Sequence, residues 1–257
     1  MESLSVGQTV VLTFGRDSNG ELGRPLATEE AEAADPETDT RATGPQRVDL
    51  PTGIVSVGSG FYHSMAVSSS GELFTWGCGS GGQLGHTRGG SRTKTVGARA
   101  APAPVSGLQE KKQHVLRVVA GRNHTCAFAA PSSTFTWGHN VHGQLGHTAA
   151  ATSRKAEAHV LEPRQLLARH TCSRLAACGE YLSAAVTQQG EVLTWGRGAN
   201  GRGGARSAWD AASAKGWLGG TAAEPHTLPK SASLTHRRFN IFCSCGFAAA
   251  SVARFFA

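Results

Sequence analysis

The stretch that decides the fold runs from Gly60-Phe-Tyr-His63 to Trp76-Gly-Cys-Gly-Ser-Gly-Gly-Gln-Leu-Gly85. The same arrangement returns along the chain as Gly121-Arg-Asn-His124 before Trp137 and as Gly179-Glu-Tyr-Leu182 before Trp195. In each copy the tryptophan lies 16 residues after the first glycine. A motif that recurs with constant internal spacing indicates a repeat protein, in which each copy is one supersecondary unit.

Each aromatic residue of the repeat is followed by glycines at fixed distances of one, six and nine residues. Four copies share this pattern, and successive aromatics are 62, 61 and 58 residues apart. The copies consist of Phe14, Gly15, Gly20 and Gly23; Trp76, Gly77, Gly82 and Gly85; Trp137, Gly138, Gly143 and Gly146; and Trp195, Gly196, Gly201 and Gly204. Glycine at these positions predicts loops with positive φ angles or close backbone contacts.

Each repeat predicts short antiparallel strands. Residues 63–67 and 72–76 are β-rich runs joined by Ser69-Ser-Gly71, which is typical of a β-hairpin. A segment led by proline, such as Pro163-Arg-Gln-Leu166, predicts an outer strand, where the missing N–H does least harm. Short sheets repeated at a long period predict an all-β fold of the β-propeller type.

Together these motifs resemble the regulator of chromosome condensation repeat, and the resemblance covers nearly the whole chain. Members of that family form propellers, usually with seven blades. The founding member is the guanine-nucleotide exchange factor for the small GTPase Ran and also binds chromatin, whereas most other members use the propeller to bind proteins. The resemblance therefore implies the fold more directly than the function.

The chain departs from that family in its number of repeats. A fourth upstream element starts at Gly246, so its tryptophan would fall beyond Ala257, and the glycine partner of Phe14 would fall before Met1. We expect about four blades, made of three complete hairpin units and a complementary half-unit at each terminus. The arrangement is either a small closed ring or an open arc, which a partner chain or further repeats would complete. We favour the arc, because blades suited to a ring of seven should not close at four.

We expect a single repeat domain over residues 1–257. Its units are approximately 1–50, 51–110, 111–170 and 171–230, with a partial unit at 231–257. Flexible insertions are expected at approximately 26–44, 87–103, 148–160 and 205–224. The composition fits this prediction, because 33 glycines argue against a helical bundle and 17% charged residues argue against a disordered tail.

No catalytic residue, cofactor site or metal site is predicted, and we expect that the protein is not an enzyme. Gly196-Arg-Gly-Ala-Asn-Gly201 matches a dinucleotide fingerprint, but the repeat already explains its glycines. His139, His142 and His147 lie close together, but no cysteine or carboxylate joins them at ligand spacing. The six cysteines form no C-x-x-C pair, which favours reduced, buried thiols.

The upstream elements complete the structural signature of the repeat. Its members here are Gly60, His63, Gly121, His124, Gly179 and Gly246. The two histidines lie in apolar strand motifs, so we expect them to make hydrogen bonds between neighbouring loops or blades rather than to act as general bases.

Charged insertions lie outside the repeat. An acidic run spans Glu29 to Asp39, and the next insertion is basic, in a chain of net charge +7. The residues of the basic insertion that could contact a partner are Arg88, Arg92, Lys94 and Arg99. Such runs are usually solvated loops, and the alternative is contact with nucleic acid or an acidic protein.

The leading hypothesis is a non-enzymatic scaffold that binds another protein through its loops. One alternative is guanine-nucleotide exchange on a Ran-like GTPase, and a second is binding of chromatin or nucleic acid through the basic insertion. The N-terminal residues carry an acid where a secretory signal carries lysine or arginine, and no apolar run is long enough to span a membrane. We therefore expect an intracellular location, in the cytoplasm or the nucleus, and no membrane partner.

Overall fold

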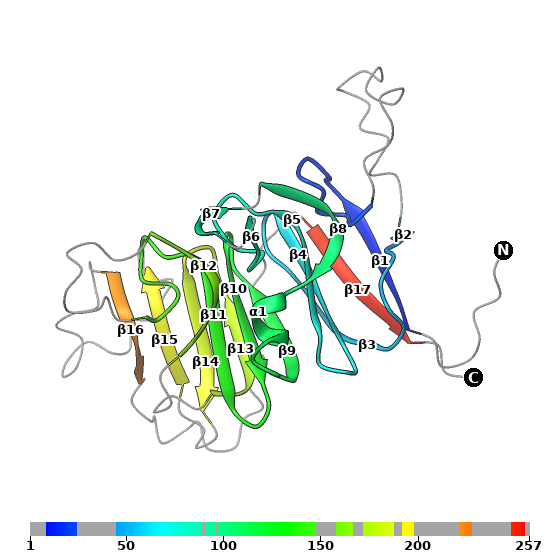
Figure 1. The fold of residues 1–257 in the computed structure, drawn as a ribbon. Coiled ribbons are helices and arrows are strands. Elements are labelled where there is room, and N and C mark those ends of the chain that lie inside the picture. Colours follow the sequence, from blue (N-terminus) through cyan, green and yellow to red (C-terminus); the bar gives the residue numbers. More distant parts are fainter. Residues whose placement is uncertain are drawn as a thin grey trace.

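The structure is a computed structural model of the chain, drawn in Figure 1. It describes residues 9–24, 45–88, 91–95, 97–147, 158–166, 172–187, 192–197, 221–227 and 248–254. Within these ranges the regular structure is β-strand, apart from the four-residue helix α1 (Ser106–Gln109). The prediction of an all-β fold is confirmed. No helix in these ranges is long and apolar enough to cross a membrane.

Four antiparallel sheets, which we call blades I to IV, form the body of the described structure. Blade I consists, in spatial order, of β17 (Ala248–Arg254), β1 (Thr9–Gly15) and β2 (Gln46–Arg47). Blade II consists of β3 (Ile54–Ser59), β4 (His63–Ser68), β5 (Leu73–Cys78) and β8 (Ala98–Pro104). Blade III consists of β9 (Val115–Ala120), β10 (His124–Ala129), β11 (Ser133–His139) and β12 (His159–Gln165). Blade IV consists of β13 (Cys172–Cys178), β14 (Leu182–Thr187), β15 (Val192–Arg197) and β16 (Thr221–Thr227).

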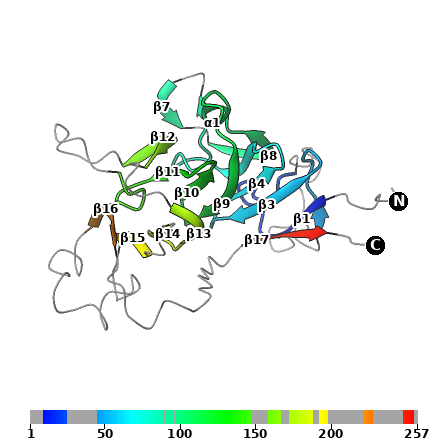
Figure 2. The same cartoon turned by 90° about the horizontal axis from the view of Figure 1, so that it is seen from below.

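The blades lie side by side along an arc. Their inner strands touch in order, β17 against β3, β3 against β9 and β9 against β13. Figure 2 shows blade IV and blade I at the two ends of the curve, with blades II and III between them. The prediction of about four propeller-type blades in an open arc is confirmed.

Blade I joins strands from the two ends of the sequence. β1 pairs antiparallel with β17, from Thr9 opposite Arg254 to Gly15 opposite Ala248. The two half-units predicted at the termini therefore complement each other within one sheet. This pairing covers one edge of each strand and so reduces the exposed backbone donors and acceptors.

The register of blade I differs by one residue from the repeat spacing. In blade II the residue three positions after the first glycine lies opposite the glycine that follows the tryptophan. From Gly246 this spacing predicts Ala249 opposite Gly15, but the structure places Ala248 there. Neighbouring positions in the run Ala248-Ala-Ala250 carry the same side chain, so the sequence does not distinguish the two registers.

The insertion predicted at 87–103 contains strands. β6 (Thr87–Arg88) and β7 (Ser91–Thr95) form a separate hairpin, and β8 pairs with β5 as the outer strand of blade II. The strand β8 ends at Pro104 instead of starting there, and it lies at the edge of the sheet, where the missing N–H groups of Pro102 and Pro104 do least harm. The predicted insertion at 26–44 and most of those at 148–160 and 205–224 lie outside the described residues.

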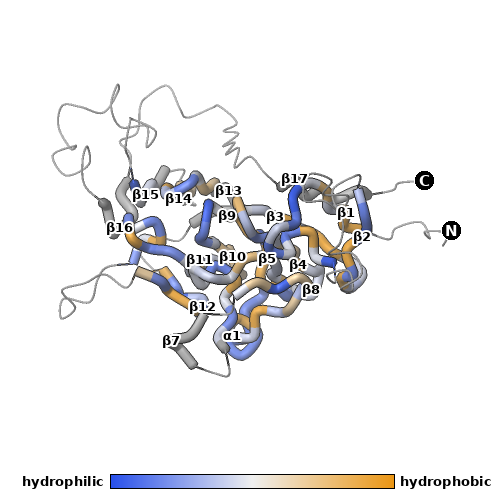
Figure 3. Tube along the Cα trace, turned by 90° about the horizontal axis from the view of Figure 1, so that it is seen from above, coloured by the Kyte–Doolittle hydropathy of each residue, from blue (hydrophilic) through white to orange (hydrophobic). Residues whose placement is uncertain are grey.

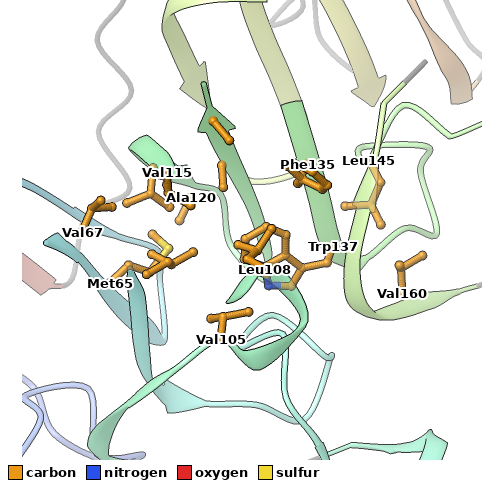
Figure 4. Close-up of a cluster of buried hydrophobic side chains, with 14 residues drawn as sticks. Met65, Val67, Val105, Leu108, Val115, Ala120, Phe135, Trp137, Leu145 and Val160 are labelled. Carbon is orange, nitrogen blue, oxygen red and sulfur yellow. The ribbon is translucent and has the colours of Figure 1, made fainter. Parts of the chain in front are cut away.

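The core lies between adjacent blades. Trp76, Trp137 and Trp195 are at most 1% exposed. In the cluster between blades II and III, Met65 and Trp137 face one another with residues from both sheets and from α1 (Figure 4). Hydrophobic residues recur through the strands of blades I to III and do not gather at one place (Figure 3). Such packing is expected where each sheet cannot bury its hydrophobic face alone.

A backbone carbonyl connects each blade to the next. The carbonyl oxygen of Glu21 accepts hydrogen bonds from Trp76 Nε1 at 2.8 Å and from Ser64 Oγ at 2.7 Å. The junction between blades II and III repeats this arrangement with Gln83, Trp137 and Thr125, at 2.9 Å and 2.8 Å. Because Trp76 and Trp137 each bond to the preceding blade, these two junctions hold neighbouring sheets in the same relation.

Candidate functional site

The inner turns, between the first and second strands of blades II to IV, stack closely on one face of the molecule. A Cβ atom on Gly60 would lie 2.4 Å from the carbonyl oxygen of Gly121, and one on Gly121 would lie 2.4 Å from that of Gly179. Only glycine permits this approach, since real Cβ contacts are never so short. The stacking places the two residues that follow each glycine beside those of the next blade.

The glycines after each aromatic shape the loops on the same side. Positive φ angles occur at Gly15, Gly20, Gly23, Gly77, Gly82, Gly85, Gly138, Gly143, Gly146 and Gly196. At Gly85, a Cβ would also lie 2.9 Å from Trp137 Nε1, so conformation and space both select glycine. Phe14 replaces tryptophan in blade I and is 37% exposed. The predicted signature residues Gly201, Gly204 and Gly246 lie outside the described residues.

Two signature histidines bridge neighbouring blades. His63 Nε2 lies 2.9 Å from Thr125 Oγ1, and His124 Nε2 lies 2.9 Å from Ser183 Oγ. Each hydroxyl donates to a carbonyl, so each histidine Nε2 is the donor in its bond. Burial lowers the pKa of His63 to about 3, with a smaller contribution from His124. A neutral, hydrogen-bonded ring in the interior stabilises the junction and offers no accessible base.

An arginine surrounded by aromatic rings occupies the centre of the stacked turns. The guanidinium of Arg122 lies 5.5 Å from the ring centre of Phe61 and 5.9 Å from those of Tyr62 and Tyr181. It also forms an ion pair with Glu180 and donates to Tyr181 Oη at 3.3 Å. We call these five residues the Arg122 cluster. The hydrogen bond with Glu180 raises the pKa of Arg122, so its charge is permanent.

The Arg122 cluster is accessible to a partner. The side chains of Arg122 and Glu180 are 35% and 38% exposed, and the three aromatic residues are half-buried. Rings held by neighbouring blades have little freedom to lose on binding. Arginine and aromatic residues are also the types enriched in protein interfaces.

Histidines extend this surface over blade III. The ring of His142 meets Tyr181 edge-on at 4.8 Å, and His139 lies 5.1 Å from His159. Burial, then the neighbouring His159, lowers the pKa of His139, while burial and then Arg197 lower that of His142. His139 Nδ1 is bonded to Gln144 Nε2 at 3.0 Å. His139 and His142 are therefore neutral at pH 7 and add polar, uncharged surface.

The third histidine of the sequence cluster points elsewhere. His147 is buried, and its Nε2 lies 2.9 Å from Thr136 Oγ1. The geometry thus separates His147 from the surface that holds His139 and His142. Among the described residues, the group of three that could hold a metal ion is a different one, formed by His124, Cys126 and Cys178.

The predicted basic contacts lie on strands of the insertion. Arg88 belongs to β6, Arg92 and Lys94 belong to β7, and Arg99 is exposed on β8 opposite Gly77. Arg99 also contributes, after burial, to the lowered pKa of His86, about 4. Binding by these four residues stays a prediction.

Sequence analysis does not predict the Arg122 cluster. Its members occupy the two variable positions between the repeat glycine and the histidine, where the motif carries no information. The cluster could be predicted from the fact that equivalent turns of neighbouring blades are adjacent. Aligning Phe61-Tyr62, Arg122-Asn123 and Glu180-Tyr181 places an arginine between two aromatic turns.

Comparison with known proteins identifies the family. The model of the Regulator of chromosome condensation (RCC1) repeat matches residues 70–128 and 133–186, and a second model of the same repeat matches 54–83. The chain belongs to this repeat family. The matches cover blades II and III and the first two strands of blade IV.

The relatives are longer than this chain. The human E3 ubiquitin-protein ligase HERC2 is 32% identical over 141 residues, which are 55% of this chain and 3% of that protein. The bovine secretion-regulating guanine nucleotide exchange factor is 29% identical over 191 residues, 73% of this chain and 37% of that protein. Yeast RCC1 (Prp20), solved bound to Kap60, has a TM-score of 0.68 and 16% identity, covering 98% of this chain and 55% of that one. The chain spans about half the length of this structure and less of the curated relatives, and the structural match supports the fold.

Proposed function

We propose that the chain is a non-enzymatic scaffold that binds another protein through the Arg122 cluster. The observation that carries the proposal is a permanent cation held among three half-buried aromatic rings on an accessible face. Glu180 pairs with one side of the Arg122 guanidinium, and other N–H donors of this planar group remain available. The surface therefore suits a partner that offers a carboxylate together with apolar side chains.

The test compares proteins bound by the full chain in cells with those bound by two charge-removing variants. Arg122→Ala removes the centre of the cluster, and Lys112→Ala removes an exposed cation after α1, outside the cluster. A hot-spot arginine contributes at least about 2 kcal/mol, so Arg122→Ala should weaken a genuine partner by about 30-fold or more. Lys112→Ala should bind as the unmodified chain does. Equal retention of every partner by both variants would contradict the proposal.

Guanine-nucleotide exchange on a Ran-like GTPase is the second candidate. It is favoured by the similarity to the secretion-regulating exchange factor over 73% of this chain. Exchange requires a surface that stabilises the nucleotide-free GTPase and needs no catalytic acid or base. The measurement is release of fluorescent GDP from a Ran-type GTPase at micromolar concentrations of this chain. Acceleration of GDP release by orders of magnitude would establish exchange activity. If folded protein does not accelerate GDP release, the scaffold remains the leading proposal.

A further inference from the structure

Two cysteines and a histidine meet inside the junction between blades III and IV. The ligand atoms of His124, Cys126 and Cys178 all lie within 4.8 Å of one another. The two sulfur atoms are 3.6 Å apart. The three side chains are at most 2% exposed, and neither cysteine forms a disulfide.

The repeat shows that this chemistry is particular to one junction. Cys126 lies two residues after the repeat histidine of blade III, and Cys178 lies immediately before the repeat glycine of blade IV. At the junction between blades II and III the equivalent residues are Met65 and Ala120, which belong to one hydrophobic cluster. The fold therefore accommodates a thioether and a methyl group at these two positions, and it does not require two thiols there.

We propose that His124, Cys126 and Cys178 form a binding site for a zinc ion. Thiolate sulfur and imidazole nitrogen are the ligands that Zn²⁺ prefers in closed, structural sites. Two sulfurs about 2.3 Å from a tetrahedral zinc lie about 3.8 Å apart. The observed separation of 3.6 Å is close to this value, so little rearrangement is needed.

Charge also favours a divalent ion at this place. Two thiolates neutralise Zn²⁺ and leave the neutral imidazole as the third ligand, so the loaded site carries no net charge. A buried site with an uncompensated charge would be strongly unfavourable. A monovalent ion with the same two thiolates would leave one negative charge in the interior.

The surroundings offer additional polar atoms. Ser183 Oγ lies 2.9 Å from His124 Nε2 and 3.8 Å from Cys178 Sγ, so a hydroxyl oxygen adjoins the three proposed ligands. His124 Nδ1 is buried and, among the described residues, has no hydrogen-bond partner. The histidine can therefore bind a metal through one nitrogen while the other keeps or gains a polar contact.

The site joins two blades, so the ion would act as a structural link. Cys126 belongs to β10 of blade III, and Cys178 belongs to β13 of blade IV. Because the ligands are buried, the ion must enter while the junction is open, during folding or local unfolding. Zinc should then increase the stability of the chain and exchange slowly once bound.

The experiment measures metal bound to the full chain after refolding with Zn²⁺ and removal of free ion. The matched variant is Cys126→Met with Cys178→Ala, which reproduces the Met65 and Ala120 pair of the neighbouring junction. The control is Cys78→Ser, a partly exposed thiol outside the site. The unmodified chain and the control should retain about one zinc per chain, and the double variant none.

Cobalt gives a second reading of the same site. Co²⁺ in place of Zn²⁺ should produce the intense visible bands of tetrahedral coordination and a near-ultraviolet band from thiolate to metal. Both bands should be lost in the double variant and kept in Cys78→Ser. The proposal is overturned if the folded double variant retains as much zinc as the unmodified chain. It is equally overturned if Cys126 and Cys178 form a disulfide in protein refolded with zinc.

Discussion

The tryptophans at two junctions should respond differently to the same substitution. Trp137 and Trp195 are equally buried, but Trp137 Nε1 donates to Gln83 O, whereas Trp195 Nε1 has no partner among the described residues. Trp137→Phe loses a hydrogen bond worth about 1 kcal/mol and leaves space that costs about 1 kcal/mol. The free energy of unfolding should therefore fall by about 2 kcal/mol.

Trp195→Phe leaves similar space but removes a buried donor that has no partner within the described part of the chain. Such a donor costs about 1–3 kcal/mol, so its removal offsets the lost packing. We expect the free energy of unfolding to change by less than about 1 kcal/mol in this variant. The two variants should thus differ by at least about 1 kcal/mol, which is a factor of five or more in the unfolding equilibrium.

The assay is urea unfolding followed by far-ultraviolet circular dichroism, since tryptophan fluorescence would change with the substitution itself. Equal slopes of free energy against urea would show that both variants unfold from the same structure to the same state. If Trp195→Phe is as destabilised as Trp137→Phe, the reasoning from hydrogen bonds is wrong and ring volume alone determines the result.

Three further predictions address pH, glycine and charge. Burial lowers the pKa of His147 to about 4, so the folded state resists protonation; the contribution of His147 to stability is complete above about pH 6.5 and should fall by about 2 kcal/mol by pH 5, in addition to the contributions of His63 and His86. His147→Gln should flatten this fall in urea midpoints measured from pH 7.5 to 5, and an unchanged slope would contradict the assignment. Gly85→Ala should lower the free energy of unfolding by more than about 1 kcal/mol, since φ at Gly85 is +73° and Trp137 blocks the added methyl group. Gly97 has open space around it, so Gly97→Ala should change the free energy of unfolding by less than about 0.5 kcal/mol. If the basic insertion binds duplex DNA, the affinity should fall steeply with salt in a binding titration. It should disappear when serine replaces Arg88, Arg92, Lys94 and Arg99, and affinity that survives the replacement excludes this surface.

The fold could be predicted because the repeat is a strong and redundant signal. The spacing of Gly60 and Trp76 determines two strands and the turn before them, and two further copies repeat it. Pairing of the terminal half-units follows from the same count. Register in blade I could not be derived, because a run of alanines specifies no face.

The candidate sites could not be predicted from motifs, because they lie where the repeat varies. Arg122 meets Phe61 and Tyr181 only after the inner turns have stacked, and these residues are about 60 positions apart in the sequence. Cys126 and Cys178 are 52 residues apart and match no metal-binding spacing. Both groups of residues form because the fold places equivalent positions of successive blades side by side.

Hydrogen bonds from the repeat histidines join one blade to the blade that follows it in the sequence. His63 bonds forward to blade III and His124 bonds forward to blade IV, but the equivalent residue of blade IV is Leu182, opposite Gly196. A leucine side chain cannot donate a hydrogen bond of this kind. Blade IV is also the end of the described arc opposite blade I (Figure 2). The polar bridge is thus present between blades II and III and between blades III and IV, and blade IV carries an apolar side chain at the position of the histidine.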